Sequence, residues 1–127
     1  MIKFRRTEPW DLPTIARFIE MDEAHKGMDA GFWEATSHGI SCYCVEDEQG
    51  PLIYVRQENL GETTRLHLQF ANCSRKKIFN ALKEGYPLVA ADARERGFKR
   101  VSFDSTSPAL IRTMLEMGFR AEMVADL

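Results

Sequence analysis

The chain has 127 residues, of which 44% are hydrophobic and 28% are charged. This composition is typical of a globular domain with its own core, and it excludes a disordered chain. Lysine and arginine number 17 against 19 aspartates and glutamates, so no overall basic field favours nucleic acid or an anionic membrane as a partner. No repeat or low-complexity linker divides the sequence, and we expect residues 1–127 to form a single domain.

The N-terminus and the cysteines predict a cytoplasmic protein. The first residues, MIKFRRTEPW, lack the apolar segment of a signal peptide, and no stretch is long and apolar enough to cross a membrane. The three cysteines, Cys42, Cys44 and Cys73, lack the spacing of a disulfide framework. Cys42 and Cys44 share one face of a strand. They are interpreted as two buried thiols, with a C-x-C metal site as the weaker alternative, and no metal is expected.

The first third of the chain predicts a strand, a helix and a loop. Alternating apolar and charged residues predict a strand over Ile2–Arg6. The sequence TEPWDLPTIARFIEMDE, residues 7–23, predicts a helix with Asp11 as its N-cap and Pro13 in its first turn. Residues 25–39 contain three glycines and two large aromatic residues, and they predict a loop with room for a short second helix.

Three strand-like runs follow, over Ile40–Glu46, Leu52–Gln57 and Thr63–Phe70. The short polar connections between them contain glycine, which favours an antiparallel meander. In the third run the leucines lie on one face and His67 lies on the other. We therefore expect one face of this strand in the core and the other face open to something polar.

The next segment, Ser74 to Gly97, changes to a helical period. Gly97 is expected just beyond the end of this long helix. Gly85 and Pro87 lie inside the pattern, and proline removes a backbone hydrogen bond. We expect either a kink or two helices that meet near Gly85.

The C-terminal part predicts a strand over residues 99–105, a helix, and a last strand over residues 119–124. Ser107 is the expected N-cap of this helix, Pro108 its first residue and Gly118 its stop signal.

The segment from Thr63 to Asp104 is long enough for a right-handed crossover between two parallel strands. The sequence therefore predicts a mixed α+β fold, with a mostly antiparallel sheet, one parallel strand pair and flanking helices.

This order, and several short stretches, resemble the GNAT superfamily, the acetyl-CoA-dependent N-acetyltransferases. The opening IKFRRTEPWDLPTIARFI is similar to that family's first strand, Arg-containing turn and Asp-capped helix. The closing FDSTSPALIRTMLEMGF resembles a family pattern of a strand residue, a polar residue four positions later, an aromatic residue in the helix, and Gly-Phe. Phe103, Ser107, Met114 and Gly118-Phe119 occupy those places.

The resemblance implies a GNAT-like sheet that splays open between the Thr63–Phe70 and Arg100–Asp104 strands. The pantetheine arm of acetyl-CoA or another acyl-CoA would enter this gap. The pyrophosphate would bind at the start of the long helix, where free amides and about half a positive charge attract anions. The cofactor-binding residues that the resemblance implies are Phe70, Ala71, Asn72, Ser74, Arg75, Lys76, Lys77 and Ser107. The implied catalytic residue is His67.

Two features depart from the family pattern. Its phosphate-binding motif is Arg or Gln, two residues, Gly, one residue, and Gly or Ala; Arg75 fits, but Ile78 and Asn80 replace the small residues. An isoleucine side chain would obstruct phosphate oxygens that approach the backbone, while the basic run Arg75–Lys77 would compensate in part. Met114 stands where active members commonly have a tyrosine that protonates the departing thiolate, and methionine has no proton to donate.

Each candidate residue also has a structural interpretation. Arg75–Lys77 either binds an anion or forms a solvated helical turn. His67 either accepts the proton of the amine, a role that water could also fill, or is a surface histidine held by a hydrogen bond. The acidic residues and His25 within residues 20–25 either line the acceptor site or end a solvated helix. The aromatic pair at 32–33 either walls an acceptor pocket or packs in the core.

The sequence predicts an N-acyltransferase that binds acyl-CoA and transfers the acyl group to an amine of a small molecule or a protein. The alternative is a non-catalytic binding or structural protein of the same fold with a degenerate CoA site. Some bacteriophage internal virion proteins are of this kind, and their tails are similar to ALIRTMLEMGF in spacing. Because the family often dimerises through its sheet, a homodimer is left open; no nucleic acid or membrane partner is expected.

Overall fold

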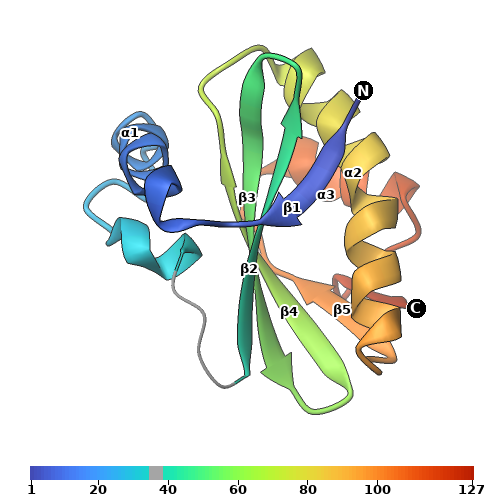
Figure 1. The fold of residues 1–127 in the computed structure, drawn as a ribbon. Helices are drawn as coiled ribbons and strands as arrows, with labels where there is room; N and C mark the ends of the chain where they lie inside the picture. The colour runs from blue at the N-terminus through green and yellow to red at the C-terminus, as the bar shows by residue number, and fades with distance from the viewer. Residues whose placement is uncertain (35–38) are drawn as a thin grey trace.

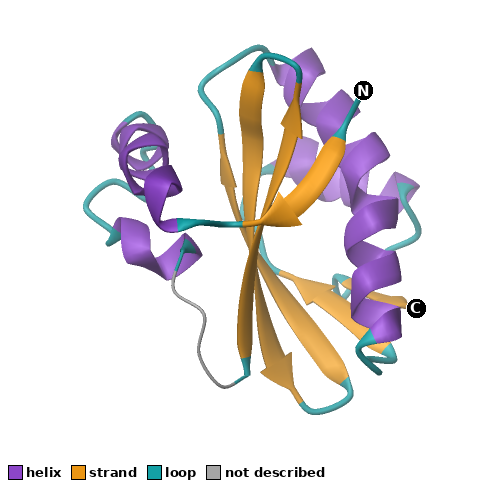
Figure 2. Cartoon of the chain, viewed as in Figure 1, coloured by secondary structure: helices purple, strands orange, loops and turns teal. Residues whose placement is uncertain are grey.

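The computed structural model, which describes residues 1–34 and 39–127, is built around a six-stranded sheet (Figure 2). The strands, in chain order, are β1 (Lys3–Arg6), β2 (Ile40–Asp47), β3 (Gly50–Leu60), β4 (Thr63–Phe70), β5 (Arg100–Phe103) and β6 (Val124–Asp126). They are hydrogen-bonded in this same order, and all neighbours are antiparallel except β4 and β5, which are parallel. The predicted mixed fold with one parallel pair is confirmed.

Helices cover both faces of the sheet (Figure 1). The long helix α2 (Arg75–Glu95) and α3 (Pro108–Glu116) lie on one face. The 3-10 turn η1 (Pro9–Asp11), helix α1 (Leu12–Glu20) and the 3-10 turn η2 (Ala30–Trp33) lie on the other side. Each face has its own buried hydrophobic cluster. Within the described ranges, no helix has both the length and the apolar character needed to span a membrane.

The second cluster corrects the expectation that one face of β4 would be open. Ile15 of α1 and Trp33 of η2 are buried against Tyr54 on that face of the sheet. Gln69, which belongs to the face that we expected to be polar, is therefore 0% exposed. His67, two residues earlier on β4, is only half-buried. The short helix expected within residues 25–39 is η2, and positions 35–38 lie outside the described residues.

The β4–α2–β5 connection is the predicted crossover between parallel neighbours. Pairing between the strands runs from Thr63 opposite Arg100 to Leu66 opposite Phe103. Strand β4 continues to Phe70 without a partner from β5. The sheet is therefore open between the two strands beyond Leu66, as the resemblance implied.

Helix α2 is a single helix, so the alternative of two helices meeting near Gly85 is wrong. Its N-cap is Ser74, whose Oγ accepts a hydrogen bond from Lys77 N at 3.2 Å. Pro87 and Lys83 both lie on the exposed side of the helix. Since proline cannot donate to the carbonyl four residues earlier, water can bond the freed oxygen of Lys83, and the helix continues. Gly97 follows the C-cap with a φ of 94°, as predicted.

The last strand begins later than predicted. Phe119 N donates back to Met114 O and closes the end of α3. Arg120 N then donates to Val124 O, across a turn that holds Met123 at a φ of 59°. The residues after Gly118 therefore form a turn, and β6 itself begins only at Val124.

Candidate functional site

A cleft of about 910 Å³ opens where β4 and β5 separate. Its walls are β4 from Arg65 to Phe70, the first turns of α2 and α3, the segment after β5, and the segments around the end of α1 and η2. Ligand pockets in proteins typically have about 300–1,000 Å³. The cleft therefore has the volume of a typical small-molecule site.

The open edge of β4 directs backbone donors toward this cleft. Ala71 N donates to Leu52 O on the β3 side at 2.8 Å. Because backbone groups alternate in direction along a strand, the N–H groups of Leu68 and Phe70 point the other way, toward β5. The β5 pairing stops at Leu66, so these two amides can bond a ligand carbonyl.

The start of α2 offers further donors at the same end of the cleft. Lys77 N and Ile78 N are both satisfied by Ser74, through its Oγ and its carbonyl oxygen respectively. The amides of Arg75 and Lys76 have no hydrogen-bond partner in the part of the chain that the structure describes. Free amides at a helix N-terminus are suited to an anionic group.

Ile78 and Asn80, which stand where the family motif has small residues, are placed differently. Ile78 is 7% exposed, packs into the cluster beneath α2 and also lines the inner wall of the cleft. Asn80 is exposed and is not part of the cleft wall. The Ile78 side chain thus narrows the cleft from its core side.

The predicted site residues divide between two neighbouring hollows. Those that line the main cleft are His67, Phe70, Arg75 and Ser107. Those that line a smaller groove of about 370 Å³, between α1 and the β2–β3 turn, are Ala71, Asn72 and Lys77. Ser74 and Lys76 line neither hollow, although Ser74 caps the helix that separates them.

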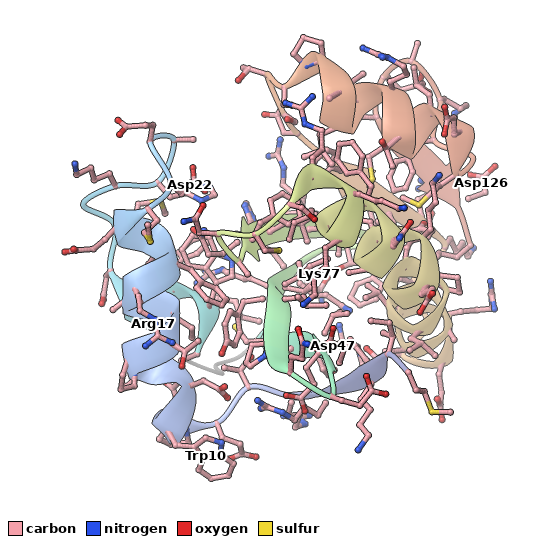
Figure 3. All side chains as sticks on the ribbon, turned by 90° about the horizontal axis from the view of Figure 1, so that it is seen from above. Trp10, Arg17, Asp22, Asp47, Lys77 and Asp126 are labelled. Atoms are coloured by element: carbon pink, nitrogen blue, oxygen red, sulfur yellow. The ribbon has the colours of Figure 1, made fainter. Side chains whose placement is uncertain are left out.

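The Lys77 ammonium is held away from the main cleft. Its Nζ lies 2.6 Å from Gln49 Oε1 and 3.6 Å from Asp47 Oδ2 at the β2–β3 turn. Figure 3 shows Lys77 and Asp47 side by side. Arg75, two residues earlier, lines the cleft itself. Of the two cations, Arg75 is therefore the one placed to meet an anion in the cleft.

His67 lies on the cleft wall, but one of its ring nitrogens is engaged. Its Nε2 is 3.2 Å from Glu58 Oε1 on β3. The edge of its ring meets Phe32, with centroids 5.3 Å apart, and the Arg56 guanidinium covers the same phenyl ring at 3.9 Å. His67 is thus a cleft residue that is also held by a hydrogen bond, and its role as a proton acceptor stays a prediction.

A second histidine lines the cleft from the segment after α1. His25 Nδ1 lies 2.7 Å from Gln69 Oε1 and 3.1 Å from Asp22 Oδ2. Asp22 follows the C-terminal end of α1 (Figure 3). The sequence left two interpretations for Asp22 and His25, the lining of an acceptor site or a solvated helix end, and it gave no role to Gln69. Its buried amide is 44 residues from His25 in the chain, and no local pattern connects the two.

The other residues singled out in the sequence have structural roles. Met114 is 0% exposed and packs in the core, outside the cleft. Burial raises the pKa of the Cys42 thiol to about 11 and that of Cys44 to about 12, so both are protonated at neutral pH. Among the described residues, no three His, Cys, Asp or Glu side chains are grouped so that they could hold a metal ion.

Solved structures with the same architecture include a GNAT domain and N-acetyltransferases. The GNAT domain of S. lividans PAT has a TM-score of 0.77 and 15% identity over 99% of this chain and 90% of that chain. The Escherichia coli ribosomal-protein-S18-alanine N-acetyltransferase has a TM-score of 0.73 and 14% identity, covering 94% and 78% of the two chains. AAC(6')-Ib, in complex with ribostamycin and coenzyme A, has a TM-score of 0.73 and 13% identity, covering 98% and 90%.

Neither a scan against protein-family models nor a search of curated proteins gives a match to this sequence. The structural likeness extends over nearly the whole chain, and it includes the parallel strand pair whose separation forms the cleft. The chain therefore has the GNAT fold.

Proposed function

We propose that the protein binds an acyl-CoA in the gap between β4 and β5 and transfers its acyl group to an amine. The observation that carries this proposal is the unpaired edge of β4, which leads along the cleft to the free amides at the start of α2. A thioester arm laid along that edge would meet backbone donors at one end and a helix N-terminus at the other. AAC(6')-Ib, which has the same fold, was solved with coenzyme A.

In this proposal the chain's own groups position the reactants. The N–H groups of Leu68 and Phe70 polarise the thioester carbonyl and stabilise the negative charge that develops on its oxygen. Arg75 and the amides of Arg75 and Lys76 hold the diphosphate. The amine nitrogen attacks the carbonyl carbon, so a C–N bond forms and the C–S bond breaks. The amine loses a proton to a base, and the CoA thiolate leaves and takes a proton from solvent.

A second candidate function is a non-catalytic GNAT-fold protein that retains the cleft for binding alone. The specific observation in its favour is Met114, which is buried in the core where active relatives commonly have a proton-donating tyrosine. No tyrosine is among the described residues that line the cleft, although the hydroxyl groups of Ser105 and Thr106 are. Protonation of the thiolate would then depend on these hydroxyls or on water.

Calorimetric titration with acetyl-CoA tests the binding site. The wild-type protein should bind, and Arg75→Ala should weaken binding by about 10-fold or more, since a charge-assisted hydrogen bond is worth about 1.5–3 kcal/mol. Lys83→Ala also removes one positive charge, from the exposed side of the same helix, and serves as the matched control. No heat of binding for the wild type, or equal affinities of the Arg75 and Lys83 variants, would contradict the proposal.

Thiol release from acetyl-CoA in the presence of primary amines separates the two candidate functions. Amine-dependent release of one CoA thiol per acyl group transferred supports the transferase. Tight binding of acetyl-CoA with no release favours the non-catalytic alternative, and stoichiometric capture of a protein partner would then identify its role.

A further inference from the structure

We propose that His25, oriented by the buried amide of Gln69 and by Asp22, is the base that accepts the proton of the attacking amine. This inference rests on the proposed function and assigns a catalytic residue within that same cleft. It differs from the assignment drawn from the resemblance, which pointed to His67.

The orientation of the Gln69 amide is fixed by its surroundings. Its Nε2 lies within reach of three acceptors: Phe70 O at 3.1 Å, Asp22 Oδ2 at 3.2 Å and Phe18 O at 3.5 Å. Only the NH₂ end of the amide can satisfy such a set of oxygens. Because Gln69 is 0% exposed, reversing the amide would leave buried oxygens facing one another, which is costly. The carbonyl end of the amide must therefore face His25.

This orientation in turn fixes the tautomer of His25. Its Nδ1 faces two acceptors, Gln69 Oε1 at 2.7 Å and Asp22 Oδ2 at 3.1 Å. The neutral imidazole has one N–H and one lone pair, so the proton belongs on Nδ1 and the lone pair on Nε2. The ring lines the cleft, and Nε2 has no hydrogen bond to the described part of the chain. It is left as an acceptor for a ligand proton.

The turn that carries His25 is held rigidly enough to present that nitrogen. Asp22 Oδ1 accepts a hydrogen bond from Ala24 N at 3.0 Å, and His25 N donates to Asp22 O at 3.1 Å. The imidazole also lies against the buried indole of Trp33, with ring centroids 5.1 Å apart. A charged imidazolium formed during the reaction would remain next to the Asp22 carboxylate, which stabilises it.

His67 is held for the same task by one partner, Glu58 at 3.2 Å, whereas His25 is held by two, one of them the fully buried amide of Gln69. Other titratable groups also face the cleft and contribute to its charge. Besides Asp22 and His25, these are Arg65 and His67 on β4, Cys73 in the loop before α2, Arg75 on α2 and Asp104 after β5. Arg65 and Asp104 lie 3.5 Å apart and largely offset one another.

In the chemical step, the amine proton passes first to His25 and then to solvent. As the amine nitrogen bonds to the thioester carbon, one of its N–H bonds breaks and the proton moves to Nε2 of His25. The C–S bond then breaks, the thiolate leaves protonated by water, and the imidazolium returns its proton to solvent. General base catalysis of this kind contributes roughly 100-fold or more to a rate.

The tautomer can be measured without turnover, from the ring-nitrogen chemical shifts of ¹⁵N-histidine-labelled wild-type protein above pH 8. The proposal predicts that neutral His25 carries its proton on Nδ1. His25→Gln identifies the resonances that belong to this residue. A neutral His25 with its proton on Nε2 would overturn the proposal, because the lone pair would then face Gln69 and Asp22.

The catalytic role is tested with acetyl-CoA and two simple acceptors, alanine amide and Nα-acetyl-lysine amide. His25→Gln should bind acetyl-CoA as the wild type does and transfer acetyl groups roughly 100-fold more slowly. Lys26→Gln, at the neighbouring exposed position, is the control and should keep the wild-type rate. In His25→Ala, added imidazole should restore part of the rate.

The outcomes distinguish this inference from the proposed function. If the wild type does not bind acetyl-CoA, the proposed function fails, and the role of His25 fails with it. If the wild type binds but transfers to neither amine, or if His25→Gln keeps the wild-type rate, the role of His25 is refuted while the co-substrate site stands.

Discussion

Asp11 joins three parts of the chain through one buried carboxylate. It was predicted to cap the first helix, but its side chain makes no capping hydrogen bond to α1. It instead accepts hydrogen bonds from Arg5 at 2.8 and 2.9 Å, from Glu8 N at 2.8 Å and from Tyr54 Oη at 2.8 Å. Burial opposes ionisation, but these hydrogen bonds outweigh it and hold the pKa of Asp11 below its ordinary value.

Asp11→Asn is therefore expected to lower the free energy of unfolding at pH 7 by about 1–3 kcal/mol. Because the folded-state pKa is depressed, the carboxylate stabilises the protein above its unfolded-state pKa of about 4, and this contribution is lost as the pH falls through the folded-state value. Urea unfolding at neutral and acidic pH should show the difference from wild type narrowing toward pH ~3. Glu23→Gln, at an exposed position, is the control. A difference that stays constant with pH would contradict this account.

The three cysteines provide a second test at the residue scale. Burial raises the pKa of Cys42 and Cys44, whereas Cys73 is exposed. A thiol reagent at neutral pH should modify Cys73 rapidly and the other two only as the protein unfolds, since the thiolate is the reactive form. In Cys73→Ser the rapid phase should disappear. Rapid labelling that persists in this variant would show that β2 is not buried as described.

Local capping residues were predictable, whereas the Asp11 and Gln69 networks were not. Ser107 and Gly97 act within a few residues of their own positions, so the sequence alone predicted their roles. The partners of Asp11 and Gln69 lie on other elements, in one case 44 residues away. Such contacts depend on the packing of α1 onto the sheet.

At the scale of elements, Gly85 sets how closely α2 approaches the sheet. A Cβ built at this position would lie 2.9 Å from Val45 Cγ1 on β2. In the sequence, Gly85 suggested a break in the helix; in the structure, it instead allows α2 to pack closely against Val45. The pattern of glycine and proline alone does not distinguish these two roles, because the answer depends on which strand lies beneath the helix.

Gly85→Ala is expected to destabilise the protein, although alanine favours a helix by about 1 kcal/mol. The added methyl group overpacks against Val45, which typically costs about 1–3 kcal/mol. Replacing Val45 by Ala removes the obstructing methyl groups. In that background, Gly85→Ala should lower the free energy of unfolding less, or should raise it. Urea unfolding of the wild type, both single variants and the double variant gives the coupling energy directly. A single Gly85→Ala variant more stable than wild type would contradict the close approach.

At the scale of the whole molecule, the cleft lies where the two buried clusters meet the opened strand pair. The order of strands and helices was predictable from hydrophobic periods and turn signals, and the parallel pair followed from the length of the crossover. The layer formed by α1 and η2 was not predicted to bury one face of β4. It brings His25, Phe32 and Trp33 to the cleft wall, so much of the candidate site arises from packing between elements.

The central claim is that the open edge of β4 and the start of α2 receive the same thioester cofactor. Amide chemical shifts of ¹⁵N-labelled protein, followed during titration with acetyl-CoA, test it most directly. The account predicts saturable changes at Leu68, Phe70, Arg75 and Lys76, with those of Lys3–Arg6, the strand at the opposite edge of the sheet, unchanged. Unchanged resonances at Leu68 and Phe70 under millimolar acetyl-CoA, or changes confined to the groove beside Lys77, would contradict it.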